Sequence, residues 1–239
     1  MINEEDHLRI QVMRSGLQID EAWRQAGDLD DRLETKLDFA FSSRLGYLTA
    51  CPTNVGTGLR ASVMMHLPAL VITRQIEKVF QAIARMRLAV RGLYGEGTQA
   101  AGDFYQVSNQ VTLGKTEEEI LETLSLTIPR IIQYEEKARE TLARESEIFI
   151  EDRIWRAVGL LSRARQISSG EATSLLSAVR MGLHMGRLRG LDVQHINRLF
   201  IGSQPGHLQV RHGGELSPEE RDVERARFVR SVLKDVDLN

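Results

Sequence analysis

The sequence predicts an α+β fold, in which an antiparallel sheet flanked by helices is followed by an all-helical domain. Over residues 1–138, strand-like and helical stretches are mixed at hairpin-like spacing, without the repeating strand–helix–strand unit of a parallel sheet. From residue 116 onward, apolar residues recur almost without interruption at helical spacing. We therefore expect two domains, residues 1–138 with the sheet and residues 139–239 with helices alone.

The first half of the chain predicts strands and two helices. Apolar residues alternate, as in half-buried strands, at residues 8–13, 60–67, 88–93 and 104–111. Helical periodicity covers residues 20–37, and a second helix is expected from Pro68, which suits a first helical turn, to residue 85. Glycines predict a turn at residues 54–58 and a loop between residues 92 and 102.

Two capping boxes mark helix starts in the second half. Thr116 lies three residues before Glu119, and Ser217 lies three residues before Glu220. In each pair the hydroxyl and the carboxylate can accept backbone N–H groups of the first turn. Loops and helix ends are expected at residues 186–190 and 202–214, which contain glycines. The helical stretches are residues 116–144, 148–167, 170–187, 192–201 and 217–234.

Composition narrows the class of protein. The formal net charge of −2 argues against a general nucleic-acid binder, and only five of the 31 basic residues are lysine. The arginine guanidinium suits phosphate and carboxylate clamps better than an ammonium group does. Cys51 is the only cysteine, which excludes an intrachain disulfide and favours a reducing compartment. With an acidic N-terminus and no apolar stretch long enough for a bilayer, we expect a cytoplasmic protein without membrane contact.

Three segments contain the residue types that phosphate chemistry needs, at residues 3–9, 51–60 and 91–97. Each segment also has an ordinary structural interpretation. Glu5 and Arg9 suit a strand start at the surface. Cys51 suits a small buried position. Arg91 and Glu96 suit a surface ion pair of little consequence.

Taken together, the three segments resemble those of one family. Residues 51–60, Cys-Pro-Thr-Asn-Val-Gly-Thr-Gly-Leu-Arg, resemble the signature of the phosphagen kinases, the ATP:guanido phosphotransferases. Residues 3–9 (Asn-Glu-Glu-Asp-His-Leu-Arg) and 91–96 (Arg-Gly-x-x-Gly-Glu) resemble the other two catalytic stretches, in the same order. Residues 60–70 and the helical C-terminal part are similar to the bacterial protein arginine kinases. The resemblance covers essentially the whole chain and implies the guanido kinase catalytic fold.

The resemblance implies catalytic roles for three residues. Glu5, as the base, and Glu96 would grip the planar guanidinium of the substrate from two sides. Such a grip suits the chemistry, because arginine attacks a γ-phosphate only when it is held in line and loses a proton. Cys51, as a thiolate, would pack against the same guanidinium without forming a covalent intermediate.

The resemblance also implies an ATP site. Arg9, Arg60 and Arg91 match the family's phosphate-clamping arginines. Mg²⁺ is implied together with ATP, and phosphate oxygens and water would hold it, so no protein metal ligand is named. The implied ATP-contacting residues are Arg60, Ala61, Ser62, Val63 and Met64 in one stretch and Arg91, Gly92, Leu93, Tyr94, Gly95 and Glu96 in the other.

A second candidate site lies near the C-terminus. Arg221 and Arg225 are four residues apart on one helix face, a like-charge pair that an anion or an acid would stabilise. A charged surface helix with compensating acids is the ordinary interpretation. The stretch resembles the Arg-Asp-x-x-Arg-Ala motif of the protein arginine kinases, which ends here at Ala226. It implies a regulatory pocket where the two arginines hold the phosphoryl group of phosphoarginine and Asp222 takes its guanidinium.

The sequence departs from the family at its start. Family members begin with a further N-terminal region, including a Ser-Ser-Arg-x-Arg segment that supplies phosphate-binding arginines, and nothing here matches it. We therefore expect an N-terminally truncated catalytic domain. Three functions remain open: a protein arginine kinase, a small-molecule guanidino kinase, and a non-catalytic phosphoarginine-binding or dimerisation module. The first implies a homodimer, arginine-bearing protein substrates, and a Clp-type AAA+ protease and a heat-shock repressor as partners.

Overall fold

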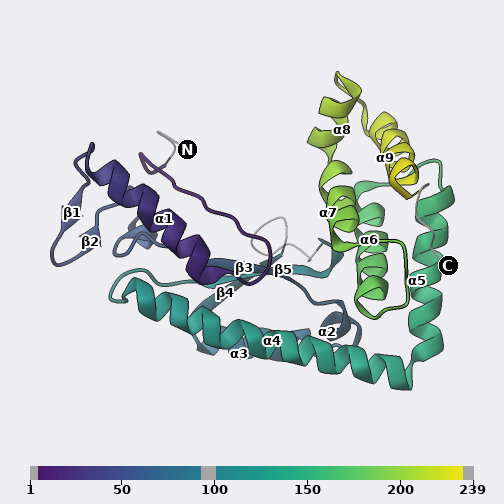
Figure 1. Cartoon of the computed structure of the whole chain (residues 1–239), viewed down its shortest axis with the longest axis horizontal. Helices are drawn as coiled ribbons and strands as arrows, with labels where there is room; N and C mark the ends of the chain where they lie inside the picture. The colour runs from purple at the N-terminus through teal and green to yellow at the C-terminus, as the bar shows by residue number, and fades with distance from the viewer. Residues whose placement is uncertain (1–4, 93–100, 234–239) are drawn as a thin grey trace. The chain divides into compact units, whose positions relative to one another are not determined.

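A computed structural model of the chain describes residues 5–92 and 101–233 (Figure 1). Its mixture of helices and antiparallel strands confirms the predicted α+β class. Nothing in the described ranges is a helix both long enough and apolar enough to cross a membrane. The elements are α1 (Ile19–Glu34), β1 (Phe41–Ser42), β2 (Gly46–Tyr47), η1 (Pro52–Asn54), β3 (Ser62–His66), α2 (Pro68–Ile72), α3 (Ile76–Arg85), β4 (Leu88–Gly92), η2 (Ala101–Asp103), β5 (Phe104–Asn109), α4 (Glu117–Glu145), α5 (Glu147–Arg163), α6 (Ser169–His184), α7 (Val193–Gly202), α8 (Pro205–His212) and α9 (Pro218–Leu233).

The described residues form two compact units. The first unit contains most of the sheet, and the second contains the C-terminal helices together with the strand ends that lead into them. The first unit comprises residues 5–65, 77–90 and 106–133, and the second comprises residues 66–76, 91–92, 101–105 and 134–233.

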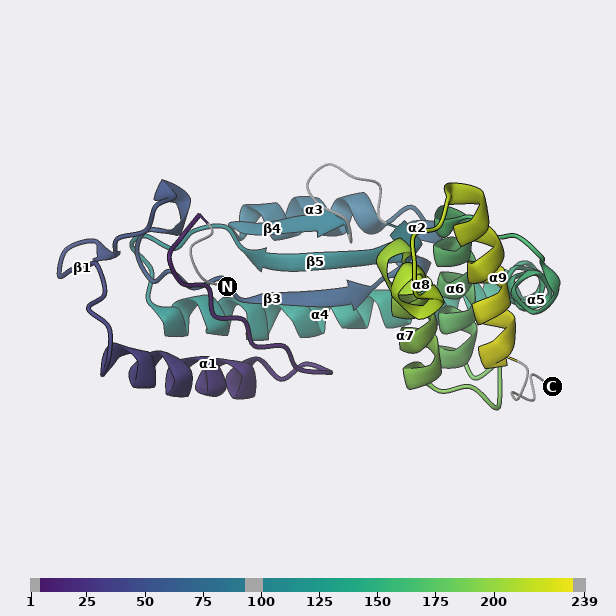
Figure 2. The same ribbon diagram turned by 90° about the horizontal axis from the view of Figure 1, so that it is seen from above.

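Strands β3, β5 and β4 form a three-stranded sheet in that order, as Figure 2 shows. Two backbone hydrogen bonds fix β3 and β5 as antiparallel neighbours. The Asn109 N–H donates to the Ala61 carbonyl (3.3 Å), and the Leu67 N–H donates to the Asp103 carbonyl (2.9 Å). The core of the first unit contains buried side chains from the sheet and from α3 and α4, including Ile83, Leu88, Val107, Leu124 and Ile128.

The strands predicted at residues 60–67, 88–93 and 104–111 are confirmed within the described residues as β3, β4 and β5. The prediction of a strand at residues 8–13 is wrong. Leu8 makes an isolated bridge, and residues 9–14 have no regular structure. Alternation detects residues that suit a strand, but a strand forms only where a neighbouring strand accepts its hydrogen bonds.

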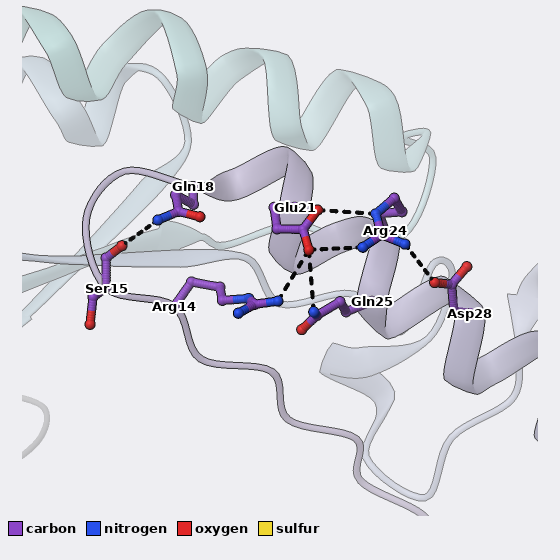
Figure 3. Close-up of polar contacts among 7 residues, drawn as sticks. All are labelled: Arg14, Ser15, Gln18, Glu21, Arg24, Gln25 and Asp28. Atoms are coloured by element: carbon purple, nitrogen blue, oxygen red, sulfur yellow. Dashed lines mark hydrogen bonds and ion pairs between the residues drawn. The ribbon is translucent and has the colours of Figure 1, made fainter.

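Helix α1 confirms the helix predicted at residues 20–37, and polar contacts at its surface hold it (Figure 3). Glu21 accepts hydrogen bonds from Arg14 (3.1 Å), Arg24 (2.8 and 3.0 Å) and Gln25 (3.2 Å). Arg24 also donates to Asp28 (2.9 Å). The hydrogen bond from Arg24 to Glu21 lowers the pKa of the Glu21 carboxyl. All 16 residues of α1 belong to the described part of the chain, and none is buried.

Both predicted capping boxes are confirmed. The Glu119 N–H donates to the Thr116 hydroxyl (3.2 Å), and the Thr116 N–H donates to the Glu119 carboxylate (3.0 Å). The same reciprocal pair joins Ser217 and Glu220, at 2.8 and 3.2 Å. These bonds satisfy N–H groups that a helix start leaves without intrahelical partners.

Two helical predictions need correction. The helix expected over residues 68–85 is interrupted after α2, where Arg74 adopts φ 55°, a left-handed conformation that a helix cannot contain. The loop expected at residues 202–214 contains α8, which begins at Pro205 and is followed by Gly213 with φ 85°. Proline at the first helical position and glycine after the last are both typical helix boundaries.

Glu135 connects two helices of the second unit. Its buried carboxylate accepts the N–H groups of Ala69 (3.1 Å) and Leu70 (3.0 Å) at the start of α2, and Arg139 Nε donates to it (2.7 Å). Burial raises the pKa of Glu135, and the Arg139 charge and the two N–H groups oppose that rise. A buried charge needs partners of this kind, because an unpaired one is costly.

Candidate active site

Asp6 joins two of the segments that the sequence singles out. Its Oδ1 accepts a hydrogen bond from the Ala50 N–H (2.7 Å), and its Oδ2 accepts one from the Asn54 side-chain amide (2.9 Å). The Asn54 bond, helped by the N–H groups of Ala50 and Cys51, holds the pKa of the Asp6 carboxyl below its usual value. The segment with Glu5 is thereby held against the loop with Cys51.

Glu5 and Arg9 contact each other at this site. Arg9 Nη2 donates to Glu5 Oε2 at 2.8 Å, and both side chains are partly exposed. The Glu5 carboxylate therefore already holds a guanidinium, the functional group of an arginine side chain. Because exposed ion pairs contribute little stability, exchanging Arg9 for another guanidinium would cost little.

Glycines allow the loop of residues 51–58 to pack closely against its neighbours. Gly56 has φ +116°, and a Cβ at this position would lie 2.4 Å from the Thr112 carbonyl oxygen. A Cβ on Gly46, which has φ +79°, would lie 2.3 Å from the Gly56 carbonyl oxygen. The Thr112 hydroxyl lies 3.0 Å from the Thr53 carbonyl oxygen. Gly56 of the signature and Gly46, which precedes the signature, thus permit close backbone contacts that a side chain at either position would prevent.

Cys51 precedes η1 and is partly exposed. Its Sγ lies 2.9 Å from Thr53 Oγ1, and its carbonyl accepts a hydrogen bond from the Thr49 hydroxyl (2.7 Å). The partial exposure contradicts the interpretation of Cys51 as a fully buried small residue. It leaves the sulfur within reach of a ligand.

Two residues of β5, which the sequence did not single out, hold the start of β3. The Asn109 amide accepts a hydrogen bond from the Ala61 N–H (2.9 Å) and donates one to the Leu59 carbonyl (2.9 Å). Arg60 Nη2 donates to the Ser108 hydroxyl (3.2 Å). Both side chains are buried, and the sequence signal for this role is a pair of adjacent polar residues at the end of a strand that begins with Phe104 and Tyr105.

The other predicted nucleotide-binding residues lie on two strands. Ser62, Val63 and Met64 belong to β3, where the first and third of these residues are exposed and Val63 is partly buried. Arg91 and Gly92 are the last two residues of β4 and are partly buried. The remaining predicted residues lie outside the described part of the chain: Leu93, Tyr94, Gly95 and Glu96.

The second candidate site centres on Arg225 of α9, which is only 1% exposed. Its Nε donates to the Ser203 carbonyl (2.9 Å), and its Nη1 donates to the Ile167 carbonyl (2.8 Å) and to the Asp222 carboxylate. The Ile167 N–H donates in return to the Asp222 carbonyl (3.1 Å). Arg225 is therefore an interior residue that fastens other segments to α9, which contradicts the ordinary interpretation of a surface helix.

The rest of the motif surrounds this buried guanidinium. Arg221 is partly buried and donates to the Leu216 carbonyl (2.9 Å), while Ala226 is fully buried. Glu224 pairs with Arg227. The two arginines predicted to repel each other thus have separate acceptors, and the phosphoarginine contacts expected of them stay predictions.

No metal cluster is present among the described residues: nowhere in 5–92 or 101–233 do three or more histidine, cysteine, aspartate or glutamate side chains gather to hold a metal ion. The side chain that the structure fixes at the start of β3 is the guanidinium of Arg60. This donor set suits phosphate oxygens rather than a cation. At this position the described residues therefore offer a donor suited to phosphate.

Two family models match the chain in succession. Residues 1–138 match the ATP:guanido phosphotransferase C-terminal catalytic domain, and residues 147–239 match the protein-arginine kinase McsB C-terminal domain. A solved structure of lombricine kinase is 34% identical, with a TM-score of 0.50, over 56% of this chain and 38% of that one.

Curated relatives named protein-arginine kinase are similar over almost the whole chain. The relative from Symbiobacterium thermophilum is 56% identical over 98% of this chain and 66% of its own length. The relative from Moorella thermoacetica is 55% identical over 98% of this chain and 67% of its own length. The chain thus spans about two thirds of the length of the relatives that it matches.

Proposed function

Because the chain belongs to the ATP:guanido phosphotransferase family, we propose that it transfers the γ-phosphoryl group of ATP to arginine side chains of proteins. Asp6 supports this proposal most directly, since its two hydrogen bonds bring the segment with Glu5 to the loop with Cys51. The relatives named protein-arginine kinase support the choice of a protein substrate. Residues 1–138 would form the catalytic part and residues 139–239 the regulatory part.

In the proposed reaction, Glu5 and Glu96 hold the substrate guanidinium in line with the γ-phosphorus. One guanidinium nitrogen attacks phosphorus, the bond from phosphorus to the bridging oxygen breaks, and ADP leaves. Glu5 takes the proton from the attacking nitrogen. Cys51 lies against the same guanidinium and helps to orient it. Positioning supplies most of the rate enhancement in phosphoryl transfer, because little covalent chemistry is required of the protein.

Arginines would bind the triphosphate in this proposal. Arg60 is positioned by Ser108 at the start of β3, and Arg9 and Arg91 would complete the clamp. Arg9 contacts Glu5 through Nη2, and the entering substrate guanidinium would take its place on that carboxylate. Mg²⁺, held by phosphate oxygens and water, would neutralise charge on the β- and γ-phosphates.

The proposal extends to regulation and partners. The motif around Asp222 and Arg225 would bind phosphoarginine and regulate the kinase. We place the protein in the cytoplasm, as a homodimer whose marked substrates pass to a Clp-type AAA+ protease and include a heat-shock repressor. These partners follow from the resemblance to bacterial protein arginine kinases.

An acid-labile phosphate assay tests the proposal. The chain is incubated with ATP, Mg²⁺, a protein substrate and free arginine. Label on protein is expected, and its loss is expected in Glu5→Ala and Glu96→Ala, whereas Glu77→Ala, at an exposed position of α3, should keep it. Label on free arginine alone would indicate a small-molecule guanidino kinase. No label would indicate a non-catalytic module.

A further inference from the structure

Arg225 ties the phosphoarginine motif to the ends of two helices. Its Nη1 donates to the carbonyl of Ile167, which directly precedes the Ser168 cap of α6. Its Nε donates to the carbonyl of Ser203, the residue that ends α7. Because Arg225 is 1% exposed, a ligand can contact it only if the groups around it move. Such a movement acts on the start of α6 and the end of α7.

The middle of α6 holds the turn that leads into β5. The Ser177 hydroxyl donates to Asp103 Oδ2 at 2.6 Å. The Ser177 Oγ also lies 2.9 Å from Nε2 of His66, at the end of β3. Since the single hydroxyl proton goes to Asp103, His66 must carry its proton on Nε2 and donate it to Ser177. One hydroxyl on α6 therefore joins the end of β3 to the start of β5.

The turn at Gly102 is packed tightly against α6 and α7. Gly102 has φ +64°, and a Cβ there would lie 2.7 Å from Thr173 Cγ2 of α6 and 3.3 Å from Phe200 Cε1 of α7. Phe200 also contacts Phe104 of β5 edge to face, with ring centroids 5.0 Å apart, and Phe104 lies 4.8 Å from the His66 ring. Helices α6 and α7, whose ends accept hydrogen bonds from Arg225, therefore both pack against the turn at Gly102.

The connection is short. Ile167 and Ser177 are ten residues apart, which is about 15 Å along a helix that behaves as a rigid rod. Phe200 lies one turn before Ser203 in α7. Because close-packed interiors resist local deformation, a shift at either helix end can reach residues 102–104 through these contacts.

We propose that Ser177 is the positioning residue through which occupancy of the Asp222–Arg225 motif is transmitted to the ends of β3 and β5. The inference rests on the proposed function, because β3 contains Ser62, Val63 and Met64, which would contact the nucleotide, and β5 contains Ser108, which accepts a hydrogen bond from Arg60. Ser177 does not touch substrate or nucleotide in this scheme. It acts through Asp103 and His66.

The test compares Ser177→Ala with Ser174→Ala, an exposed serine one turn earlier on the same helix. Phosphoarginine is titrated into each variant, and backbone amide exchange is followed at residues 62–67 and 101–109 with and without this ligand. Both variants should bind phosphoarginine. The exchange change at these residues should persist in Ser174→Ala and disappear in Ser177→Ala. Phosphoarginine should change the kinase activity of Ser174→Ala but not that of Ser177→Ala. The expected change is fivefold or more, because coupled sites typically affect each other by about 5–150-fold.

A second variant guards against simple misfolding. Asp103→Gly removes the carboxylate and suits the φ of 59° at this position, so the turn can form without the Ser177 bond. It should also lose the exchange change while retaining phosphoarginine binding. A wild-type exchange response in Ser177→Ala and Asp103→Gly would overturn the inference alone. If the wild-type chain shows the exchange response but transfers no phosphate to protein, the proposed function alone is overturned. If the wild-type chain does not bind phosphoarginine, the inference and the regulatory assignment are both overturned.

Discussion

Asp6 holds together two segments of the candidate site, and in the proposed reaction it positions a neighbouring residue without contacting the substrate. The residue lies beside Glu5 in the sequence, and its two oxygens accept bonds from Ala50 and Asn54. A base is effective only when its position is fixed relative to the other groups that hold the substrate. Asp6 supplies that fixed position for Glu5 relative to Cys51.

We expect Asp6→Ala to lower kinase activity by about 100-fold, the size of effect that a displacement of about 1 Å can cause. The fold should persist, because Asp6 is only partly buried and lies outside the core of the first unit. Activity and circular dichroism of the variant are compared with those of Asp38→Ala, an exposed aspartate outside these contacts. Equal activity in the two variants would contradict the positioning role.

His66 predicts a dependence of stability on pH. Burial lowers the pKa of His66 well below its usual value, and the charges of Arg180 and Arg139 and the neighbouring His184 act in the same direction. An unfolded histidine binds a proton below about pH 6.5, and the folded one does not. The unfolded chain then holds more protons, so the free energy of unfolding falls as pH decreases below that value.

Urea unfolding at pH 7.5 and pH 5.5 measures this effect. For one proton the free energy of unfolding should fall by at most about 1.4 kcal/mol per pH unit. His66→Gln, which keeps an N–H for Ser177 but cannot titrate, should reduce the difference between the two pH values. The pKa of His184, which is also lowered by desolvation and by the charges of Arg139 and Arg180, would account for part of the remainder. An unchanged difference in the variant would rule out the contribution of His66.

At the scale of elements, the sequence predicts best where the cause of a structure is local. The capping boxes at Thr116 and Ser217 act within one helical turn, and both form as expected. The strand expected at residues 8–13 depends on a partner strand, and Arg225 is buried by segments far from it in sequence. Such tertiary contacts leave no periodic signal, so only the resemblance to a family indicated that residues around Arg225 matter.

In the candidate site, too, local motifs can be predicted from the sequence and tertiary contacts cannot. Its family was predicted from three contiguous motifs and is confirmed by the matching family models and relatives. The sequence does not predict the residues that hold the motifs in place: Asp6 lies inside a motif without a catalytic role, and Asn109 and Ser108 lie about 50 residues from the groups that they bind. Motif patterns identify reacting groups more readily than the groups that position them.

Helix α4 depends on Glu135 for its connection to α2. Glu135→Ala should lower the free energy of unfolding by about 3 kcal/mol, because it leaves the partly buried charge of Arg139 and two N–H groups without their acceptor. Urea unfolding measures the loss, with the exposed neighbour Glu136→Ala as the control. Adding Arg139→Met should restore part of the stability. A loss equal to that of the control would contradict the role of the buried carboxylate.

At the scale of the whole molecule, ligand binding should be visible as stability. A ligand that binds only the folded chain stabilises it by about 2.7 kcal/mol at 100 times its Kd. Phosphoarginine should therefore raise the unfolding temperature of the wild-type chain. Asp222→Ala should abolish the rise, and Glu224→Ala, which alters another acid of the same helix, should retain it. Equal shifts in both variants would place phosphoarginine elsewhere on the protein.

Helix α1 has a further consequence that concerns ionic strength. Its contacts around Glu21 and Arg24 are exposed ion pairs, and no side chain of this fully described helix is buried. Charges at a protein surface are screened within about 8 Å at physiological salt and within about 3 Å at 1 M. The order of α1 therefore depends on the surrounding electrolyte, whereas the sheet and the C-terminal helices depend on their buried cores.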